Sequence, residues 1–243
     1  MGNPISWFEI HGPQPEQTSK FYSELFGWHT ETMEGGYIVM DTHSGAGTNG
    51  GVSQPPPGGK PGFVIYAQDA DIQALLEKAE ALGGKTAMPV TEIPNMVTYA
   101  TFSDPWGNVI GLMKGDENNA HVSPGDNAPM DWFQISCAEP KKAWDFYREL
   151  FGWTIEGAEA GDMVHGSVDT GSFGARGGIG NSRDGKPRVD LYAKVDDLDK
   201  YLERAESLGG TIAMPSMKVD DHTVIAMFTD PQGTTFGLYS YTE

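Results

Sequence analysis

Few side chains in this 243-residue chain have a type and spacing that suggest chemistry. The histidines show no mutual spacing typical of metal ligands, so we predict a surface or loop position for each of them. His165 and His222 lie in or beside predicted strands, from which they could alternatively reach a cleft. The histidines are His11, His29, His43, His121, His165 and His222. The single cysteine, Cys137, excludes an internal disulfide and a four-cysteine metal site, and it indicates a reducing compartment.

A glycine-rich run at residues 45–50, GAGTNG, fits the pattern G-x-G-x-x-G. A dinucleotide site needs that pattern between a strand and a helix. Here the run leads into a short strand and three prolines, so we predict a hairpin loop rather than a nucleotide site.

Two stretches carry the residue types that line small-molecule sites. WFEI at 7–10 places Trp7 two residues before Glu9, and WFQI at 132–135 places Trp132 two residues before Gln134. Residues two apart in a strand point to the same face. Each pair therefore predicts an apolar wall beside a polar group, which is typical of ligand pockets.

The two stretches belong to a duplication. Residues 5–28 return as 130–153, and FSDPWG at 102–107 returns as FTDPQG at 228–233, at an offset of 125 to 126 residues. A period this long indicates duplicated domains rather than short stacked repeats. The predicted organisation is a first domain at 1–114, a polar linker rich in Gly, Pro and Asn at 115–129, and a second domain at 130–243.

Each copy alternates between strand and helix periodicity. The first half predicts a strand near 7–10, a helix at 15–26 ended by Gly27, and short strands at 36–41 and 50–53. The second half predicts a strand at 63–67, a helix capped by Asp71 and closed by Gly83, and strands at 97–103 and 109–113. Each copy therefore contains two βαβββ modules.

Composition limits the partners. The net charge is −18 and the pI is about 4.5, which disfavours nucleic acid and anionic membrane surfaces. No apolar run approaches the roughly 18 residues of a membrane span. We therefore expect a cytoplasmic protein, a monomer or weak dimer, whose partner is a small molecule.

The motifs together resemble one family. FYSELFGW after a first strand, ALGG after a second helix and DPWGNVIGL at the end are similar to the vicinal-oxygen-chelate superfamily. That superfamily includes glyoxalase I, extradiol dioxygenases, fosfomycin resistance enzymes and bleomycin-binding proteins. The resemblance implies an α+β fold in which four βαβββ modules form two half-open, barrel-like sheets with the helices outside.

The resemblance also implies where metal ligands would stand: a histidine on the first strand, a histidine at the start of the fifth strand and a glutamate on the last strand of each copy. Those positions hold Trp7, Val64 and Gly111 in the first copy, and Trp132, Asp190 and Gly237 in the second. A remaining ligand position, within 49–53 or 177–181, has no acid or imidazole. Transition metals in such sites need three or four converging His or carboxylate ligands, so we predict no metal cofactor.

If the barrel interior is preserved, the vacated positions become an aromatic cleft. The fifth strands then add Tyr66 beside Val64 and Tyr192 beside Asp190. The predicted ligand-binding residues are Trp7, Glu9, Tyr66, Trp132, Gln134, Asp190 and Tyr192. In the alternative interpretation, Trp7 and Trp132 only fill the core.

Three functions remain open at this point. The first is a metal-free protein that binds a small, largely apolar or aromatic molecule, as in the bleomycin-resistance branch. The second is a metal-independent enzyme that uses Glu9 or Asp190 as an acid or base. The third is a metal-dependent lyase or dioxygenase whose ligands lie at other positions.

Overall fold

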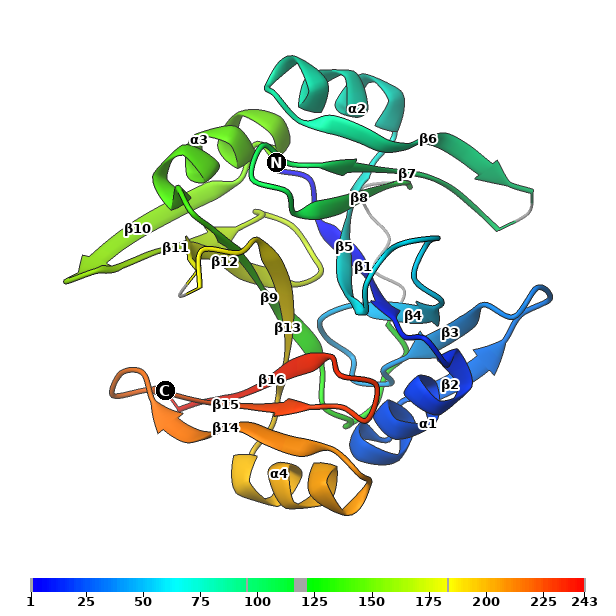
Figure 1. Ribbon diagram of the computed structural model, residues 1–243, viewed down its shortest axis with the longest axis vertical. Helices are drawn as coiled ribbons and strands as arrows, with labels where there is room; N and C mark the ends of the chain where they lie inside the picture. Colours follow the sequence, from blue (N-terminus) through cyan, green and yellow to red (C-terminus); the bar gives the residue numbers. More distant parts are fainter. Residues whose placement is uncertain (1, 95, 116–121, 183, 243) are drawn as a thin grey trace. The chain divides into compact units, whose positions relative to one another are not determined.

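The computed structural model describes residues 2–94, 96–115, 122–182 and 184–242, so His121 and linker residues 116–121 lie outside the described residues. The first copy forms one eight-stranded sheet in the order β2-β3-β4-β1-β5-β8-β7-β6 (Figure 1). Its strands are β1 (Ile5–His11), β2 (His29–Thr32), β3 (Ile38–Asp41), β4 (Asn49–Ser53), β5 (Gly62–Asp69), β6 (Lys85–Ile93), β7 (Val97–Ser103) and β8 (Val109–Lys114).

The second copy repeats this sheet in the order β10-β11-β12-β9-β13-β16-β15-β14. Its strands are β9 (Met130–Cys137), β10 (Thr154–Ala160), β11 (Met163–Asp169), β12 (Arg176–Asn181), β13 (Arg188–Lys194), β14 (Thr211–Lys218), β15 (Thr223–Thr229) and β16 (Thr235–Tyr241). In the two sheets the modules meet where β1 lies beside β5 and where β9 lies beside β13. Within the second module of each copy, β5 pairs with β8 and β13 pairs with β16 in parallel.

Four helices in the described chain pack on these strands: α1 (Pro15–Phe26), α2 (Ile72–Ala81), α3 (Pro140–Phe151) and α4 (Leu198–Ser207). The predicted signals are confirmed, because the Asp71 side chain accepts a hydrogen bond from the Ala74 amide and Gly27 ends α1 with a φ of +80°. No described helix has the length and apolar character that a membrane span requires.

The predicted fold class is confirmed: the protein is α+β, with four βαβββ modules arranged as two open eight-stranded sheets. The sequence pattern did not delimit β2 or β6. Both are edge strands, every residue of β2 is exposed, and β6 has no buried residue. A strand without a buried face carries no apolar alternation, so periodicity does not reveal it.

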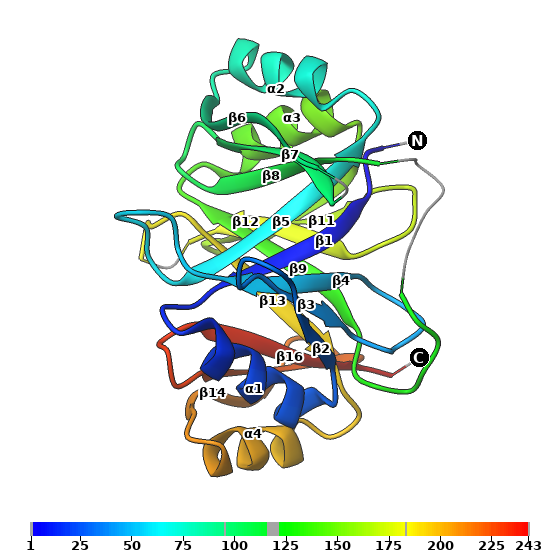
Figure 2. The ribbon, with the colours of Figure 1, turned by 90° about the vertical axis from the view of Figure 1, so that its right-hand side faces the viewer.

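The chain packs as two compact units, each built from both copies. The first unit comprises residues 1–7, 64–120 and 133–189, and the second comprises 8–63, 121–132 and 190–243. Within the first unit α2 contacts α3, and within the second α1 contacts α4, as Figure 2 shows. Each sheet is formed by one copy of the sequence repeat. Each compact unit, in contrast, combines one module from the first copy with one module from the second.

A buried tyrosine–aspartate hydrogen bond joins the two modules of each unit. In the first unit the Tyr147 hydroxyl donates to Asp104 at 2.9 Å, and in the second the Tyr22 hydroxyl donates to Asp230 at 3.1 Å. Both tyrosines are fully buried. Burial, reinforced by the neighbouring carboxylate, raises the pKa of each phenol well above its usual value, so both remain donors at neutral pH.

Candidate functional site

The first strand of each copy has one buried face and one partly exposed face. Phe8 and Ile10 are fully buried, while Trp7 and Glu9 between them are only partly buried. The same alternation in β9 buries Phe133 and leaves Trp132 and Gln134 partly exposed. The two tryptophans are therefore not members of the fully buried core, which distinguishes them from the aromatic side chains that pack under the helices.

Glu9 lies in a polar cluster in the second unit. It accepts a short hydrogen bond from the Ser53 hydroxyl on β4, and its Oε1 atom is 3.6 Å from Nε2 of His11. The Glu9 side chain is 12% exposed and that of His11 is 17% exposed. The expectation that His11 is a surface or loop residue is wrong, because β1 continues through His11 and places it on the same face as Glu9.

The two glycines at predicted ligand positions lie beneath tyrosine rings. Gly111 is the parallel-strand partner of Tyr66, and Gly237 is that of Tyr192. A Cβ atom at Gly111 would lie 2.2 Å from the Tyr66 ring, and one at Gly237 would lie 2.0 Å from the Tyr192 ring. The tyrosine rings thus occupy the space through which a glutamate side chain would leave either position.

The donor set does not fit the divalent metal that the family resemblance implies. In the first copy the ligand positions offer an indole, the buried Val64 and a glycine covered by a ring. In the second, Asp190 is the one possible donor at the three positions, and it is buried. Among the residues that the structure describes, no group of three or more His, Cys, Asp or Glu side chains is arranged to hold a metal ion.

Two of the predicted aromatic residues, Tyr66 and Trp132, each lie near one further aromatic ring. In the first unit the rings of Tyr66 and Tyr99 meet edge to face at 6.5 Å. In the second unit Trp132 lies 6.5 Å from the ring of Tyr239, whose hydroxyl donates to Asp131 at 2.8 Å. Tyr99 and Tyr239 extend the aromatic set beyond the sequence prediction, which did not include them because they lie on β7 and β16 rather than on the repeated motifs.

A second polar pair lies in the first unit. Nε2 of His165, on β11, is 3.0 Å from Oε1 of Gln134, on β9. Burial lowers the pKa of His165. His165 was expected in or beside a strand, and the structure places it within β11 next to a predicted site residue.

Cys137 has no features of a nucleophile. It is fully buried at the end of β9, and burial raises the pKa of its thiol to about 11. A thiol is reactive mainly as the thiolate, so this side chain is a packing residue, as predicted.

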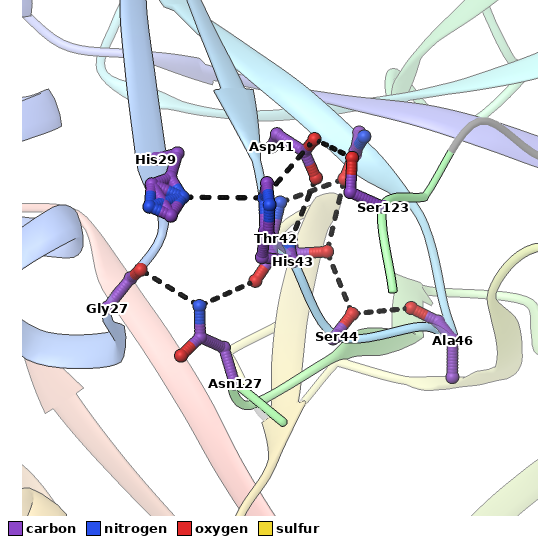
Figure 3. A network of polar contacts seen from close by, with 10 residues as sticks. Gly27, His29, Asp41, Thr42, His43, Ser44, Ala46, Ser123 and Asn127 are labelled. Carbon is purple, nitrogen blue, oxygen red and sulfur yellow. Dashed lines mark hydrogen bonds and ion pairs between the residues drawn. The ribbon is translucent and has the colours of Figure 1, made fainter. Parts of the chain in front are cut away.

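Figure 3 shows a separate polar network around the loop that follows β3. Asp41 accepts a short bond from the Ser123 hydroxyl, and Asn127 donates to the carbonyl groups of Gly27 and Thr42 at 2.9 and 3.1 Å. Although burial opposes it, the hydrogen bonds from Ser123 and the His43 amide lower the pKa of Asp41. The network anchors the described end of the linker to the second unit.

The same network contains an imidazole pair. Nδ1 of His29 and Nδ1 of His43 are 3.3 Å apart, and His43 has a φ of +49°. His43 is the one non-glycine residue with positive φ among those described. Its own amide donates to Asp41 at 3.0 Å, which stabilises this uncommon backbone conformation.

A surface groove of about 400 Å³ lies elsewhere in the first unit, between Trp106 after β7 and Phe146 on α3. None of the predicted site residues lines it. The groove and the predicted residues are therefore distinct features.

Two family models match the chain in tandem. The model of the Glyoxalase/Bleomycin resistance protein/Dioxygenase superfamily matches residues 5–112, and that of the Glyoxalase-like domain matches residues 132–239. The two matches correspond to the two sheets.

Relatives of similar length carry different names. The chain is 24% identical over 248 residues to "Putative glyoxylase CFP32" of Mycobacterium tuberculosis (strain CDC 1551 / Oshkosh), covering 98% of this chain and 94% of that protein. It is 26% identical over 261 residues to "Anthracycline biosynthesis protein DauV" of Streptomyces sp. (strain C5), covering 98% and 93%. The chain is thus similar over nearly its whole length to proteins named for different chemistry.

Among solved structures, the Mn(II)-bound glyoxalase from Novosphingobium aromaticivorans superposes with a TM-score of 0.73 at 14% identity. The match covers 100% of this chain and 84% of that one. At this identity the likeness establishes the fold, because one fold hosts many unrelated functions.

Proposed function

Because this chain belongs to the Glyoxalase/Bleomycin resistance protein/Dioxygenase superfamily, with two tandem domains, we propose that it binds a small, largely apolar or aromatic molecule without a metal cofactor. The observation that carries the proposal is the pair of tyrosine rings over Gly111 and Gly237, where the family resemblance implies a carboxylate ligand. In both copies this position holds a glycine covered by a tyrosine ring, so it offers aromatic surface in place of a metal ligand.

The partly exposed tryptophans support an aromatic ligand. Trp7 and Trp132 offer flat apolar surface, and Glu9 and Gln134 two residues further along each strand offer polar groups. Two relatives are named anthracycline biosynthesis proteins, which makes a polycyclic aromatic compound the first ligand class to test. We expect no nucleic acid or membrane partner, a monomer or weak dimer, and a cytoplasmic location.

The binding proposal predicts quenching of tryptophan fluorescence by 2-hydroxyanthraquinone. Trp7→Ala and Trp132→Ala should each weaken binding by about 1–3 kcal/mol, because stacking and burial are lost. Titration of the chain after treatment with EDTA should give the same affinity as titration before it. Loss of binding on chelation would contradict the metal-free site, and unchanged affinity in both variants would contradict the assignment of the tryptophans.

The polar cluster at Glu9 favours a second candidate, a metal-independent enzyme. A carboxylate that is 12% exposed, bonded to Ser53 and adjacent to His11, is positioned to exchange a proton with a bound molecule.

Glu9→Gln separates the two candidates, because it preserves shape and reproduces Gln134 of the other copy. For an enzyme, turnover of any compound found by product screening should fall by about 100-fold or more with little change in affinity. Asp190→Asn is the matched variant for the other predicted carboxylate. If Glu9→Gln and Asp190→Asn both leave turnover unchanged, neither carboxylate is the acid or base.

A further inference from the structure

The paired imidazoles of His29 and His43 have the spacing of two ligands of one metal ion. Their Nδ1 atoms are 3.3 Å apart and their ring planes meet at 75°, so one ring nitrogen faces the other (Figure 3). A tetrahedral Zn²⁺ ion, with bonds of about 2.0–2.1 Å to imidazole nitrogen, holds two such nitrogens about 3.3–3.4 Å apart. An ion can therefore replace the contact between the rings with little movement of either side chain.

One side chain fixes the backbone next to both histidines. The Asn127 amide donates to the carbonyl group of Gly27, two residues before His29, at 2.9 Å. It also donates to the carbonyl group of Thr42, directly before His43, at 3.1 Å. The two segments that carry the imidazoles are thus held together before any ion binds, so binding requires little further ordering.

A carboxylate adds negative charge beside the pair. Asp41 is the cross-strand partner of His29, and its Oδ2 atom is 3.4 Å from Nδ1 of His43. Asp41 also accepts hydrogen bonds from the Ser123 hydroxyl and the His43 amide, so it favours a nearby cation without being a ligand itself. The site has two protein ligands, with water at the remaining positions, which agrees with the absence of a group of three donors among the described residues.

The second copy forms the same turn without histidines. Thr154 pairs with Asp169 as His29 pairs with the matching aspartate of the first copy. The Gly171 amide donates to Asp169 at 2.8 Å, and Gly171 has a φ of +69°, so it matches His43 with its φ of +49°. Glycine adopts this conformation without strain, whereas a histidine there costs backbone energy. The turn itself therefore does not account for the histidine at residue 43.

We propose that Nδ1 of His29 and Nδ1 of His43 together bind a divalent transition-metal ion of the class that imidazole prefers, such as Zn²⁺. The ion links the edge strand β2 to the end of β3, next to the anchored part of the linker. His29 is exposed and the His43 side chain is 39% exposed, so an ion reaches both from solvent. Neither histidine belongs to the proposed ligand-binding set or stands where the family resemblance implies a metal ligand.

Calorimetric titration of Zn²⁺ into the untagged full chain, treated with EDTA and then desalted, tests the proposal. His29→Thr and His43→Gly copy the residues of the second copy at these positions, so both variants should fold. Each should weaken Zn²⁺ binding by at least about tenfold, because the remaining imidazole loses the advantage of a second linked ligand. His222→Ala, which removes an exposed histidine outside the pair, is the control and should bind Zn²⁺ as the wild type does.

Nitrogen-15 NMR of the histidine rings identifies the ligand atoms. With His29 and His43 assigned from the two variants, one equivalent of Zn²⁺ should shift the Nδ1 signals of both rings and show both protonated at Nε2. Mg²⁺, which prefers oxygen ligands, should shift neither ring. Absence of Zn²⁺ binding, wild-type affinity in either variant, or shifts confined to other histidines overturns the proposal. The anthraquinone titration tests the proposed binding function separately, because neither His29 nor His43 is among its predicted residues.

Discussion

Gly237→Ala should destabilise the protein by about 2–3 kcal/mol, although alanine is normally preferred to glycine within a strand. The added methyl group would lie 2.0 Å from Cδ1 and 2.2 Å from Cε1 of Tyr192. These atoms belong to a partly buried ring rather than to the flexible end of a side chain, so the ring or the strand must move. Urea denaturation of the full chain measures the loss of unfolding free energy.

Gly62→Ala is the matched control. Gly62 also lies in a strand, β5, and a Cβ atom there would meet nothing within 4 Å. We expect this variant to be neutral or slightly stabilised. A double-mutant cycle of Gly237→Ala with Tyr192→Ala should show a coupling of about 1–2 kcal/mol, since removal of the ring relieves the overlap. Equal stability of Gly237→Ala and Gly62→Ala would contradict the seating of the Tyr192 ring on Gly237.

Tyr22→Phe should lower the free energy of unfolding by about 2–3 kcal/mol, whereas Tyr147→Phe should lower it by about 1 kcal/mol. The two hydroxyls are both buried and both donate to an aspartate, but those aspartates differ in their other contacts. Oδ2 of Asp104 also accepts from the side chain of Asn108 at 2.9 Å. The residue matching Asn108 beside Asp230 is Thr234, whose backbone amide donates to Oδ1, so loss of the Tyr22 hydroxyl removes the described donor to Oδ2.

The effect of Tyr22→Phe should depend on pH. Burial raises the pKa of Asp230 above its usual value, and hydrogen bonds, including the one from Tyr22, oppose that shift. The raised pKa favours the native state at acidic pH, and this contribution is lost as pH rises through the folded-state pKa.

Since the Tyr22 bond stabilises the ionised carboxylate, its removal should cost most near neutral pH and less as Asp230 becomes protonated. Unfolding free energies of the wild type and Tyr22→Phe, measured from about pH 7 to about pH 4, should therefore converge. Two results would contradict this account. One is an equal loss of unfolding free energy in Tyr22→Phe and Tyr147→Phe at neutral pH, and the other is a difference between wild type and Tyr22→Phe that does not vary with pH.

Much of the fold could be predicted from local pattern. Three signals depend only on residues close together in the chain: the duplicated motifs, the alternation around Trp7 and the capping residue Asp71. The structure forms the expected strand at Trp7 and the expected helix start at Asp71. The edge strands β2 and β6 could not be delimited in this way, because their exposed residues carry no periodic signal. The family resemblance implied the positions at which metal ligands would stand, and the absence of a metal cofactor stays a prediction.

The candidate site depended more on tertiary structure. Nothing near Glu9 in the sequence indicates its bond to Ser53, 44 residues away, and nothing near Gln134 indicates His165, 31 residues away. The order and register of the strands in the sheet determine which of these side chains meet. A histidine judged from its own neighbours therefore looks like any surface residue.

The sequence by itself determined the repeat, the modules and the face of each strand on which the candidate residues lie, because these follow from the chemistry of residues close together in the chain. The tertiary structure alone decided that Tyr22 meets Asp230, 208 residues away, so that each compact unit combines modules from both copies. It also decided that tyrosine rings cover Gly111 and Gly237. Both outcomes depend on which apolar surfaces pack against each other and so leave water. Local periodicity shows that a face is buried but not which surface packs against it.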